Sequence, residues 1–296
     1  MSDTSREEQE AARARMVGFW RHYDAMEARL SRPLTERMLD LAGVSPRMHV
    51  LDVACGRGEP AVPAAHRVGP RGRVLGIDLV DGVLEIARER ARREGLENIA
   101  FQVADAETLD VGARAFDVAT LRWGLMYMRE PERALTSIHR ALKPGGVLVI
   151  ASWAEPARVP WASLARGVLE RYREVPPLPR ADEPGVFRHA DPARLEAALQ
   201  GSGFSVEASE ELEVPIVEAR DARDIVTWIR QLGGPVMKLV GELPEPQQRA
   251  WEAELIMELE LELERSRAGD TVTLGGVTRL TLATAIAAHG GKSPRE

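Results

Sequence analysis

The chain of 296 residues is poor in cysteine and in lysine, with one cysteine, Cys55, and three lysines among its 39 basic residues. A single cysteine cannot form a disulfide within the chain, and a lack of disulfides is usual in the reducing cytosol. No apolar run approaches the roughly 20 residues that a membrane-spanning helix needs. Residues 2–10 are polar and acidic, unlike a signal peptide. We therefore expect a cytoplasmic protein with no membrane partner.

Excess positive charge and metal-ligand spacings are absent as well. The net charge of −7 does not favour binding to nucleic acid, whose phosphate backbone is itself negatively charged. The sequence has no H-x-E or C-x-x-C spacing and no carboxylate pattern typical of a metal site. Its 44% hydrophobic and 29% charged residues are usual for a globular protein. A small molecule is the expected partner, while the sequence leaves the oligomeric state open.

The most informative stretch is His49-Val-Leu-Asp-Val-Ala-Cys-Gly-Arg-Gly58, an apolar run that breaks into a glycine loop. Such a run predicts a buried parallel strand that enters a tight turn, where glycines let the backbone approach a ligand. A second apolar run, Arg73 to Asp78, follows within one helix length and ends in a carboxylate. A carboxylate at a strand tip is the group that binds ribose hydroxyls. Together the two runs predict an α/β sheet that binds an adenosine moiety.

The glycine loop differs from the dinucleotide fingerprint of dehydrogenases. That fingerprint requires G-x-G-x-x-G at the first turn, but Ala61 stands at the third glycine position here. An acidic residue, Asp52, lies inside the first strand and ahead of the glycines. We therefore do not expect a dinucleotide at this loop.

With these residues the chain resembles the class I S-adenosylmethionine-dependent methyltransferases, whose first motif reads like D-x-x-C-G-x-G. Further matches to the family's motifs follow in order: Asp78 after the second strand, Val103-Ala-Asp-Ala-Glu107, Phe116-Asp-Val-Ala-Thr-Leu121, and Arg140-Ala-Leu-Lys-Pro-Gly-Gly146 with the apolar run behind it. The greatest similarity is to the ubiquinone/menaquinone-type and small-molecule natural-product methyltransferases. The resemblance spans residues of about 45 to 155 and implies S-adenosylmethionine as cofactor.

Strands and helices alternate from residue 49 to 153, which predicts an α/β fold with a Rossmann-like, mostly parallel sheet and helices on both faces. Helices are also expected over 5–42, with Pro33 opening a second one, and over 221–242 and 246–268. The expected domains are an N-terminal helical lid (1–45), the cofactor-binding core (46–217), a helical cap insertion (218–270), and C-terminal strands that complete the sheet (271–296).

The segment Met257 to Glu264 alternates apolar and acidic residues with a period of two, as a strand would. Its Glu, Leu and Met residues are nevertheless good helix formers, and Pro244 and Pro246 precede it as at a helix start. We therefore expect a helix.

The resemblance assigns a role to each residue of the expected cofactor site. Asp52 would hold the cofactor ammonium, Asp78 both ribose hydroxyls, and Asp105 the adenine amino group beside Ala106. The helix that starts near Glu59 would offer free N–H groups to the anionic end. Ala54, Gly56, Gly58, Leu79 and Arg122 complete the expected set. Cys55, in the tight turn, is expected to pack rather than react.

The expected catalytic region follows the fourth strand, where Arg122-Trp-Gly-Leu-Met-Tyr-Met128 is rich in apolar and aromatic residues. Relatives often carry a histidine base there, whereas this chain has Tyr127, whose ordinary pKa near 10 makes it a poor base. His22 and His189 are the other catalytic candidates. Tyr23, Trp123 and Met126 are expected to line the substrate pocket.

The resemblance implies an enzyme that methylates a small, partly hydrophobic metabolite, with a hydroxyl as the favoured acceptor and carbon or nitrogen as alternatives. A natural product or a quinone-like molecule would suit that description. Two other functions remain open, because a fold does not fix a function. One is a decarboxylase or cyclase that uses S-adenosylmethionine without methyl transfer. The other is a catalytically inactive binding protein.

Overall fold

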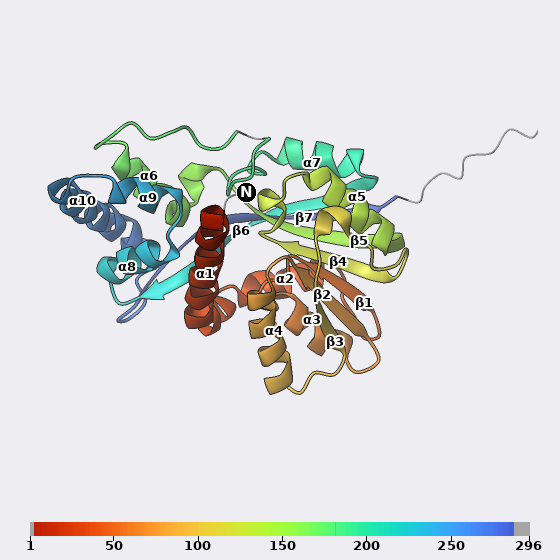
Figure 1. Ribbon diagram of the computed structural model, residues 1–296. Helices are drawn as coiled ribbons and strands as arrows, with labels where there is room; N and C mark the ends of the chain where they lie inside the picture. Colours follow the sequence, from red (N-terminus) through yellow and green to blue (C-terminus); the bar gives the residue numbers. More distant parts are fainter. Residues whose placement is uncertain (1–2, 181, 287–296) are drawn as a thin grey trace, which may run out of the picture. The chain divides into compact units, whose positions relative to one another are not determined.

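A computed structural model describes residues 3–180 and 182–286, with side chains omitted for 3–13 and 265 (Figure 1). The helices are α1 (Asp3–Leu30), α2 (Arg32–Leu41), α3 (Ala61–Val68), α4 (Asp81–Arg93), α5 (Pro131–Ala141), α6 (Pro160–Leu169), α7 (Pro192–Gly201), α8 (Ala222–Leu232), α9 (Pro235–Gly241) and α10 (Glu245–Leu263). The strands are β1 (His49–Val53), β2 (Arg73–Asp78), β3 (Ile99–Val103), β4 (Phe116–Arg122), β5 (Leu142–Trp153), β6 (Phe204–Ala219) and β7 (Val272–Ala285).

The seven strands form one sheet in the order β3-β2-β1-β4-β5-β7-β6. The pairings of β1 with β2 and β4, of β2 with β3, and of β4 with β5 are all parallel. This confirms the Rossmann-like α/β fold expected from the alternation of strands and helices. Strand order reverses between β1 and β4, and ligands of open α/β sheets bind at the carboxyl ends of strands at such a point.

The chain divides into two compact units. The first comprises residues 1–36, 152–191 and 211–279, and the second comprises residues 37–151, 192–210 and 280–296. We call them the helical unit and the nucleotide unit. Strands β5, β6 and β7 each run from one unit into the other. The roles expected for residues 1–45 as a lid and for 218–270 as a cap stay predictions.

In the nucleotide unit, alternate residues of β1 face opposite sides of the sheet. Leu51 and Val53 belong to a buried core with Leu135 and Ile138 of α5 and residues of α7. On the other side, Asp52 reaches the first turn of α3. Figure 1 shows α3 and α4 on one side of these strands and α5 and α7 on the other. Buried apolar side chains of this kind stabilise a fold by about 1.5–3 kcal/mol each.

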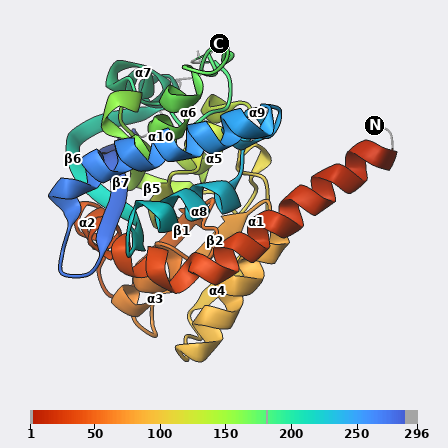
Figure 2. The same ribbon diagram turned by 90° about the vertical axis from the view of Figure 1, so that its left-hand side faces the viewer.

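In the helical unit, α10 lies against α8 and α6, as Figure 2 shows. Trp251, Leu255, Leu259 and Leu263 of α10 are buried, at spacings of four residues. The alternating segment from Met257 to Glu264 is thus helical as expected, apart from its last residue, which begins a short 3-10 turn.

Two expectations about elements were wrong. Residues 221–242 form two helices, because Gly233 and Gly234 adopt positive φ angles of 73° and 94° that interrupt the first helix. The C-terminal segment forms the single strand β7 in place of the several strands expected, and residues 287–296 of the predicted 271–296 segment lie outside the described residues. Among the helices that are described, none is long and apolar enough to cross a membrane.

Candidate cofactor and active site

Two residues that directly follow β1 and β4 have strained backbones. Ala54 and Trp123 both adopt a φ of 54°, a left-handed conformation that non-glycine residues avoid. The next residue after Trp123 is Gly124, and a Cβ there would lie 2.5 Å from the Cβ of Ala54. The two loops therefore touch at the point where strand order reverses. Strained backbone of this kind concentrates at functional sites.

The glycines of the first loop have different surroundings. Gly56 has a φ of 51°, and a Cβ at this position would meet nothing within 4 Å. At Gly58, with a φ of 94°, a Cβ would lie 3.0 Å from Val62 of α3 and 3.3 Å from Ala87 of α4. Gly58 thus permits close packing of the loop on the helices, while Gly56 leaves open space beside the loop.

Asp78, the last residue of β2, ties the glycine loop to the second strand. Its Oδ2 accepts a hydrogen bond from the Gly56 N–H at 3.0 Å, and its Oδ1 accepts one from the Val80 N–H at 3.0 Å. Burial raises the pKa of Asp78, while these backbone donors oppose the rise. The carboxylate is therefore fixed in place before any ligand binds, which is what a ribose-binding group requires.

Asp52 is fully buried beneath the loop. Its Oδ1 accepts from the Thr120 hydroxyl and its Oδ2 from the Ala61 N–H, both at 2.8 Å. Burial raises its pKa to about 7, although the Thr120 hydrogen bond and the charge of Arg122 lower it. The sequence did not single out Thr120, since only the pairing of β4 with β1 brings it to Asp52.

The expectation of free N–H groups at the start of α3 was wrong for its first residues. The Ala61 N–H donates to Asp52, and the Val62 N–H donates to the Gly58 carbonyl at 2.8 Å. Residue 63 is a proline and has no N–H group to donate.

At the ends of β2 and β3, two large apolar side chains face solvent. Leu79 is 64% exposed and Val103 is 48% exposed, and the register pairs Asp78 with Val103. An apolar surface beside the anchored carboxylate of Asp78 would suit a flat base. Sequence reasoning selected Leu79 but missed Val103, because exposure at the end of a strand depends on the fold.

Asp105 and Ala106 lie just beyond β3. The Asp105 side chain accepts from the Glu107 N–H at 2.9 Å and so caps a short 3-10 turn, in which Ala106 is buried. Capping occupies one of the lone pairs of this carboxylate, and its role toward an adenine amino group stays a prediction.

Two further buried side chains lie at these loops: Arg122 at the turn after β4 and Glu59 in the glycine loop. Arg122 is buried at the end of β4, with its guanidinium carbon 4.8 Å from the centre of the Trp123 ring. Glu59 in the glycine loop forms a buried ion pair with Arg90 of α4 at 2.7 Å. Arg90 also reaches Glu94 at 3.1 Å. Burial of both partners makes the pair Glu59–Arg90 costly to break.

Cys55 packs, as expected from its place in the turn. It is 2% exposed, and a Cβ on Gly76 of β2 would lie 2.8 Å from its sulfur. Burial raises the pKa of the thiol well above its ordinary value. The nucleophilic thiolate is therefore suppressed.

Tyr127, Trp123 and Met126 come together in the turn after β4, within the nucleotide unit. Tyr127 is 54% exposed, yet the surrounding protein desolvates its hydroxyl and raises its pKa to about 12. Its phenol is neutral at physiological pH and can donate a hydrogen bond, but it cannot serve as a base. Met126 is 3% exposed.

The other predicted residues, His22, Tyr23 and His189, all belong to the helical unit. The ring centres of His22 and Tyr23 are 4.6 Å apart, and the Tyr23 hydroxyl donates to Gln231 at 2.6 Å. His189 is buried, with 5% exposure. Among the side chains that the structure describes, those of residues 14–180, 182–264 and 266–286, no group of three or more histidine, cysteine or carboxylate residues could hold a metal ion.

Comparison with known proteins agrees with this geometry. Residues 45–176 match the Methyltransferase domain family. Nocamycin O-methyltransferase of Saccharothrix syringae is 30% identical over 264 residues, which cover 85% of this chain and 90% of that protein. The chain therefore belongs to the S-adenosylmethionine-dependent methyltransferases.

Other relatives match less than half of this chain. Aklanonic acid methyltransferase DauC of Streptomyces sp. (strain C5) is 35% identical over 130 residues, 44% of this chain and 59% of that protein. Ubiquinone/menaquinone biosynthesis C-methyltransferase UbiE of Shewanella sp. (strain W3-18-1) is 33% identical over 134 residues, 45% of this chain and 53% of that protein. The matches thus span little more than half the length of these two relatives.

Solved structures share the fold. The [4+2]-cyclase SpnF aligns with a TM-score of 0.53 at 21% identity over 86% of this chain and 82% of its own. The YcgJ protein of Bacillus subtilis aligns with a TM-score of 0.53 at 17% identity over 86% and 98%. At these identities the similarity concerns the fold alone.

The residues at the switch point fit S-adenosylmethionine, the cofactor of this class. The open space beside Gly56, the anchored carboxylate of Asp78 and the exposed Leu79 and Val103 would suit its amino acid, ribose and base portions. The buried carboxylate of Asp52 lies beneath the same loop.

Proposed function

We propose that the chain methylates a hydroxyl oxygen of a small, partly hydrophobic metabolite such as a natural product or a quinone-like molecule. The observation that carries the methyl-transfer site is Asp78, held between the glycine loop and β2. The preference for oxygen is supported by the name of the relative that aligns over most of the chain, nocamycin O-methyltransferase.

The cofactor supplies the chemistry, since its sulfonium carries an electrophilic methyl group. In the proposal, Asp78 holds the ribose hydroxyls and Leu79, Val103, Asp105 and Ala106 surround the base. Asp52 and the loop residues Ala54, Gly56 and Gly58, with Arg122 nearby, bind the amino acid portion. The protein contributes alignment of acceptor and methyl group, which is worth up to about 7–11 kcal/mol in well-oriented reactions.

The acceptor side of the proposal relies on hydrogen bonding rather than on a strong base. Tyr127 holds the acceptor as a neutral donor, consistent with its pKa of about 12. Trp123 and Met126 form an apolar wall, and the role expected of Tyr23 toward the acceptor stays a prediction. His22 and His189 are the candidates for a base if one acts.

Carbon methylation is the second candidate, because the UbiE relatives are named C-methyltransferases and match 45% of this chain at 33% identity. Incubation with S-adenosylmethionine carrying a ¹³C-methyl group and a panel of phenolic and quinol acceptors separates the two. We expect product carbon spectra to show a methoxy signal. A methyl signal bound to carbon would reject oxygen as the acceptor.

The cofactor site itself is tested by Asp78→Ala. Loss of two charge-assisted hydrogen bonds, each worth about 1.5–3 kcal/mol, predicts at least about 100-fold weaker binding of S-adenosylhomocysteine in calorimetry. Asp81→Ala is the matched control, since Asp81 is three residues further on, 65% exposed and paired with Arg88. Equal affinity in the Asp78 variant and the native protein would overturn the assignment.

A further inference from the structure

The segment from Met257 to Glu264 alternates apolar and acidic residues, and this pattern has a particular consequence in a helix. Residues two apart in a helix are separated by about 200° around its axis, so alternation places apolar side chains on two opposite faces. In α10, Leu259 and Leu263 face inward and are buried. Met257 and Leu261 lie on the opposite face and are 64% and 66% exposed. The helix therefore presents a second apolar face to solvent.

This outer face continues toward the N-terminal end of α10. Ala250 and Ala253 precede Met257 and Leu261 at spacings of three and four residues, which places all four on one side of the helix, and both alanines are exposed. We call these four residues the outer face; Figure 2 shows α10 from that side. The outer face has small side chains in its first half and large ones in its second half. A second helix with the same residues fits it when the two run in opposite directions.

The carboxylates beside the outer face differ in their partners. Glu254 and Glu258 both form ion pairs with Arg171 of α6–α7 loop residues in the same unit, so their charges are balanced. Glu260 and Glu264, at the C-terminal end, form no ion pair with any side chain that the structure describes. The C-terminal end of a helix carries partial negative charge, so acidic residues there are unfavourable without a cation nearby. This end of the outer face calls for a positively charged neighbour.

The N-terminal end of the same face offers positive charge. Arg249 lies at its edge, on the side where Glu260 lies, and is 65% exposed. Its ion pair within the chain is with Glu245, which is 80% exposed, and such surface pairs contribute little. The first turn of the helix adds the positive end of the helix dipole. A purely basic partner would match only the acidic end, whereas an inverted copy of the same helix matches both ends.

We propose that the outer face of α10 binds the same face of a second copy of this chain, with the two helices antiparallel about a two-fold axis near Met257. In this arrangement Leu261 of one protomer packs on Ala253 of its partner, and Arg249 of one protomer approaches Glu264 of its partner. The two-fold symmetry makes each of these contacts twice.

The size of this interface determines how it is measured. The contact from Arg249 to Glu264 extends about 22 Å along each helix. Because each protomer contributes one helix, we expect an interface at the small end of specific complexes, roughly below 1,200 Å². The dimer should therefore be reversible, and its population should rise with protein concentration.

Analytical ultracentrifugation of the full chain over about 1 to 200 μM tests the apolar part of the interface. We expect the native chain to pass from monomer to dimer in this range. Met257→Lys and Leu261→Lys should each weaken dimerisation at least about 100-fold, because both protomers lose an apolar contact. Leu178→Lys is the control, since Leu178 is an exposed apolar residue of the same unit, at 38%, and lies outside α10. The Tm of all three variants at low concentration should stay unchanged, because these side chains are exposed.

Charge reversal tests the partner and the direction of the helices. Arg249→Glu and Glu264→Arg should each weaken dimerisation about tenfold or more, because two attractive contacts become repulsive. The double variant should recover the native dissociation constant to within about threefold. Within one chain the two residues are separated by about 22 Å of helix, so recovery requires a contact between protomers.

A native chain that stays monomeric at every concentration would overturn the proposal. Dimerisation that is unaffected by Met257→Lys and Leu261→Lys, or a double charge variant that does not recover, would overturn it as well. A monomeric native chain with a lower Tm in Met257→Lys would show that the chain itself covers the outer face. The dimer does not depend on the proposed reaction, so absence of methylated product in the acceptor panel would leave it standing.

Discussion

At the scale of single residues, Asp52 makes a distinctive contribution to pH dependence. An unfolded aspartate has a pKa near 3.9, while burial raises that of Asp52 to about 7. Between these values the folded chain holds a proton that the unfolded chain releases. The contribution of Asp52 to stability therefore falls as pH rises from about 4 to 7, by at most about 4 kcal/mol.

Asp52→Asn should remove this dependence. The amide oxygen can still accept from the Ala61 N–H, and the amide nitrogen can donate to Thr120, whose hydroxyl can turn to accept. Urea unfolding from pH 4.5 to 8 should show that the variant gains stability relative to the native chain as pH rises. Other carboxyls, such as Asp117, have lowered pKa values and titrate oppositely, so the difference between the two proteins is the relevant quantity. If the free energies of unfolding of the two proteins changed with pH in parallel, the role assigned to Asp52 would be contradicted.

Tyr127 leads to a kinetic prediction. If it only positions the acceptor, Tyr127→Phe should reduce turnover about tenfold to a few hundredfold, or about 1.4–3.5 kcal/mol. The loss of a true base usually reduces turnover about 10²–10⁴-fold. The measurement compares Tyr127→Phe, His22→Ala and His189→Ala at saturating cofactor with the acceptor found in the panel. His189 is buried, so the Tm of its variant must be recorded. A loss near 10⁴-fold in one histidine variant with intact cofactor binding would show that a base is essential.

At the scale of elements, close backbone approach limits what β7 tolerates. A Cβ on Gly275 would lie 1.9 Å from the carbonyl oxygen of Val214 in β6, where only backbone movement could relieve the clash. Gly275→Ala should therefore lower the free energy of unfolding by about 1–3 kcal/mol or more. Gly167→Ala is the control within α6, because a Cβ there would meet nothing within 4 Å. Alanine stabilises a helix by about 1 kcal/mol relative to glycine. Urea denaturation should show a lower free energy of unfolding for Gly275→Ala and a higher one for Gly167→Ala. An unchanged free energy of unfolding in Gly275→Ala would mean that β6 and β7 readily shift apart.

Elements and site residues differed in how far the sequence could predict them. The positions of Asp78 and of the glycine loop depend on neighbours along a short strand-turn unit, so motif and periodicity sufficed to predict where they lie. The helix from Met257 to Leu263 followed from the helix propensity of its residues, despite their alternation of apolar and acidic side chains. Thr120 and Val103 were missed because their environments arise from pairing between strands distant in the sequence. The N–H groups of α3 were misjudged because the carboxylate of Asp52, nine residues earlier, takes one of them.

At the scale of the whole molecule, the N-terminal helix belongs to the helical unit through several contacts. Phe19 packs on Trp228, Tyr23 donates to Gln231, and Arg29 pairs with Glu218. Deletion of residues 1–30 should therefore abolish turnover, because it removes these contacts and the expected lid. The residues proposed to bind the cofactor all lie within residues 37–151 of the other unit, so binding of S-adenosylhomocysteine should persist.

Calorimetry and product mass spectrometry on the truncated chain check both halves of that prediction. Turnover at the native rate would contradict the lid role expected for the N-terminal helix. The division into two units was not evident from composition, because no linker separates them and residues from three stretches of sequence combine in each.

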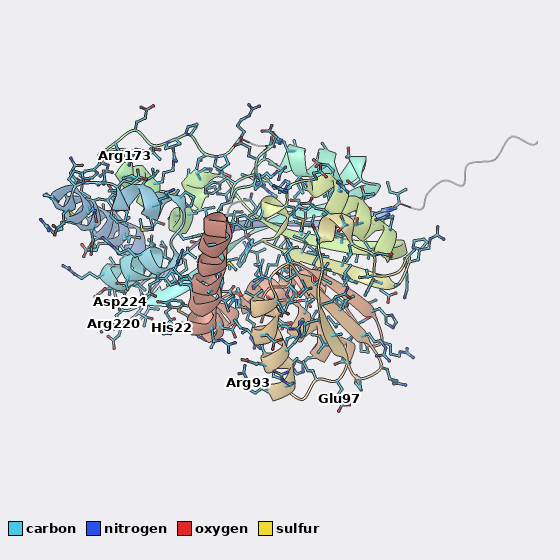
Figure 3. The ribbon with its side chains drawn as sticks, viewed as in Figure 1. His22, Arg93, Glu97, Arg173, Arg220 and Asp224 are labelled. Carbon is cyan, nitrogen blue, oxygen red and sulfur yellow. The ribbon has the colours of Figure 1, made fainter. Side chains whose placement is uncertain are left out.

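The buried sulfur of Cys55 has a practical consequence. Packed against Gly76 and 2% exposed, it should not react with maleimides while the chain is folded. As the chain has no other cysteine, native protein behaves toward such reagents as if it had none. A cysteine introduced at an exposed position such as Glu97 (Figure 3) would then be the sole site for a fluorophore or spin label, with no need to replace a native residue first.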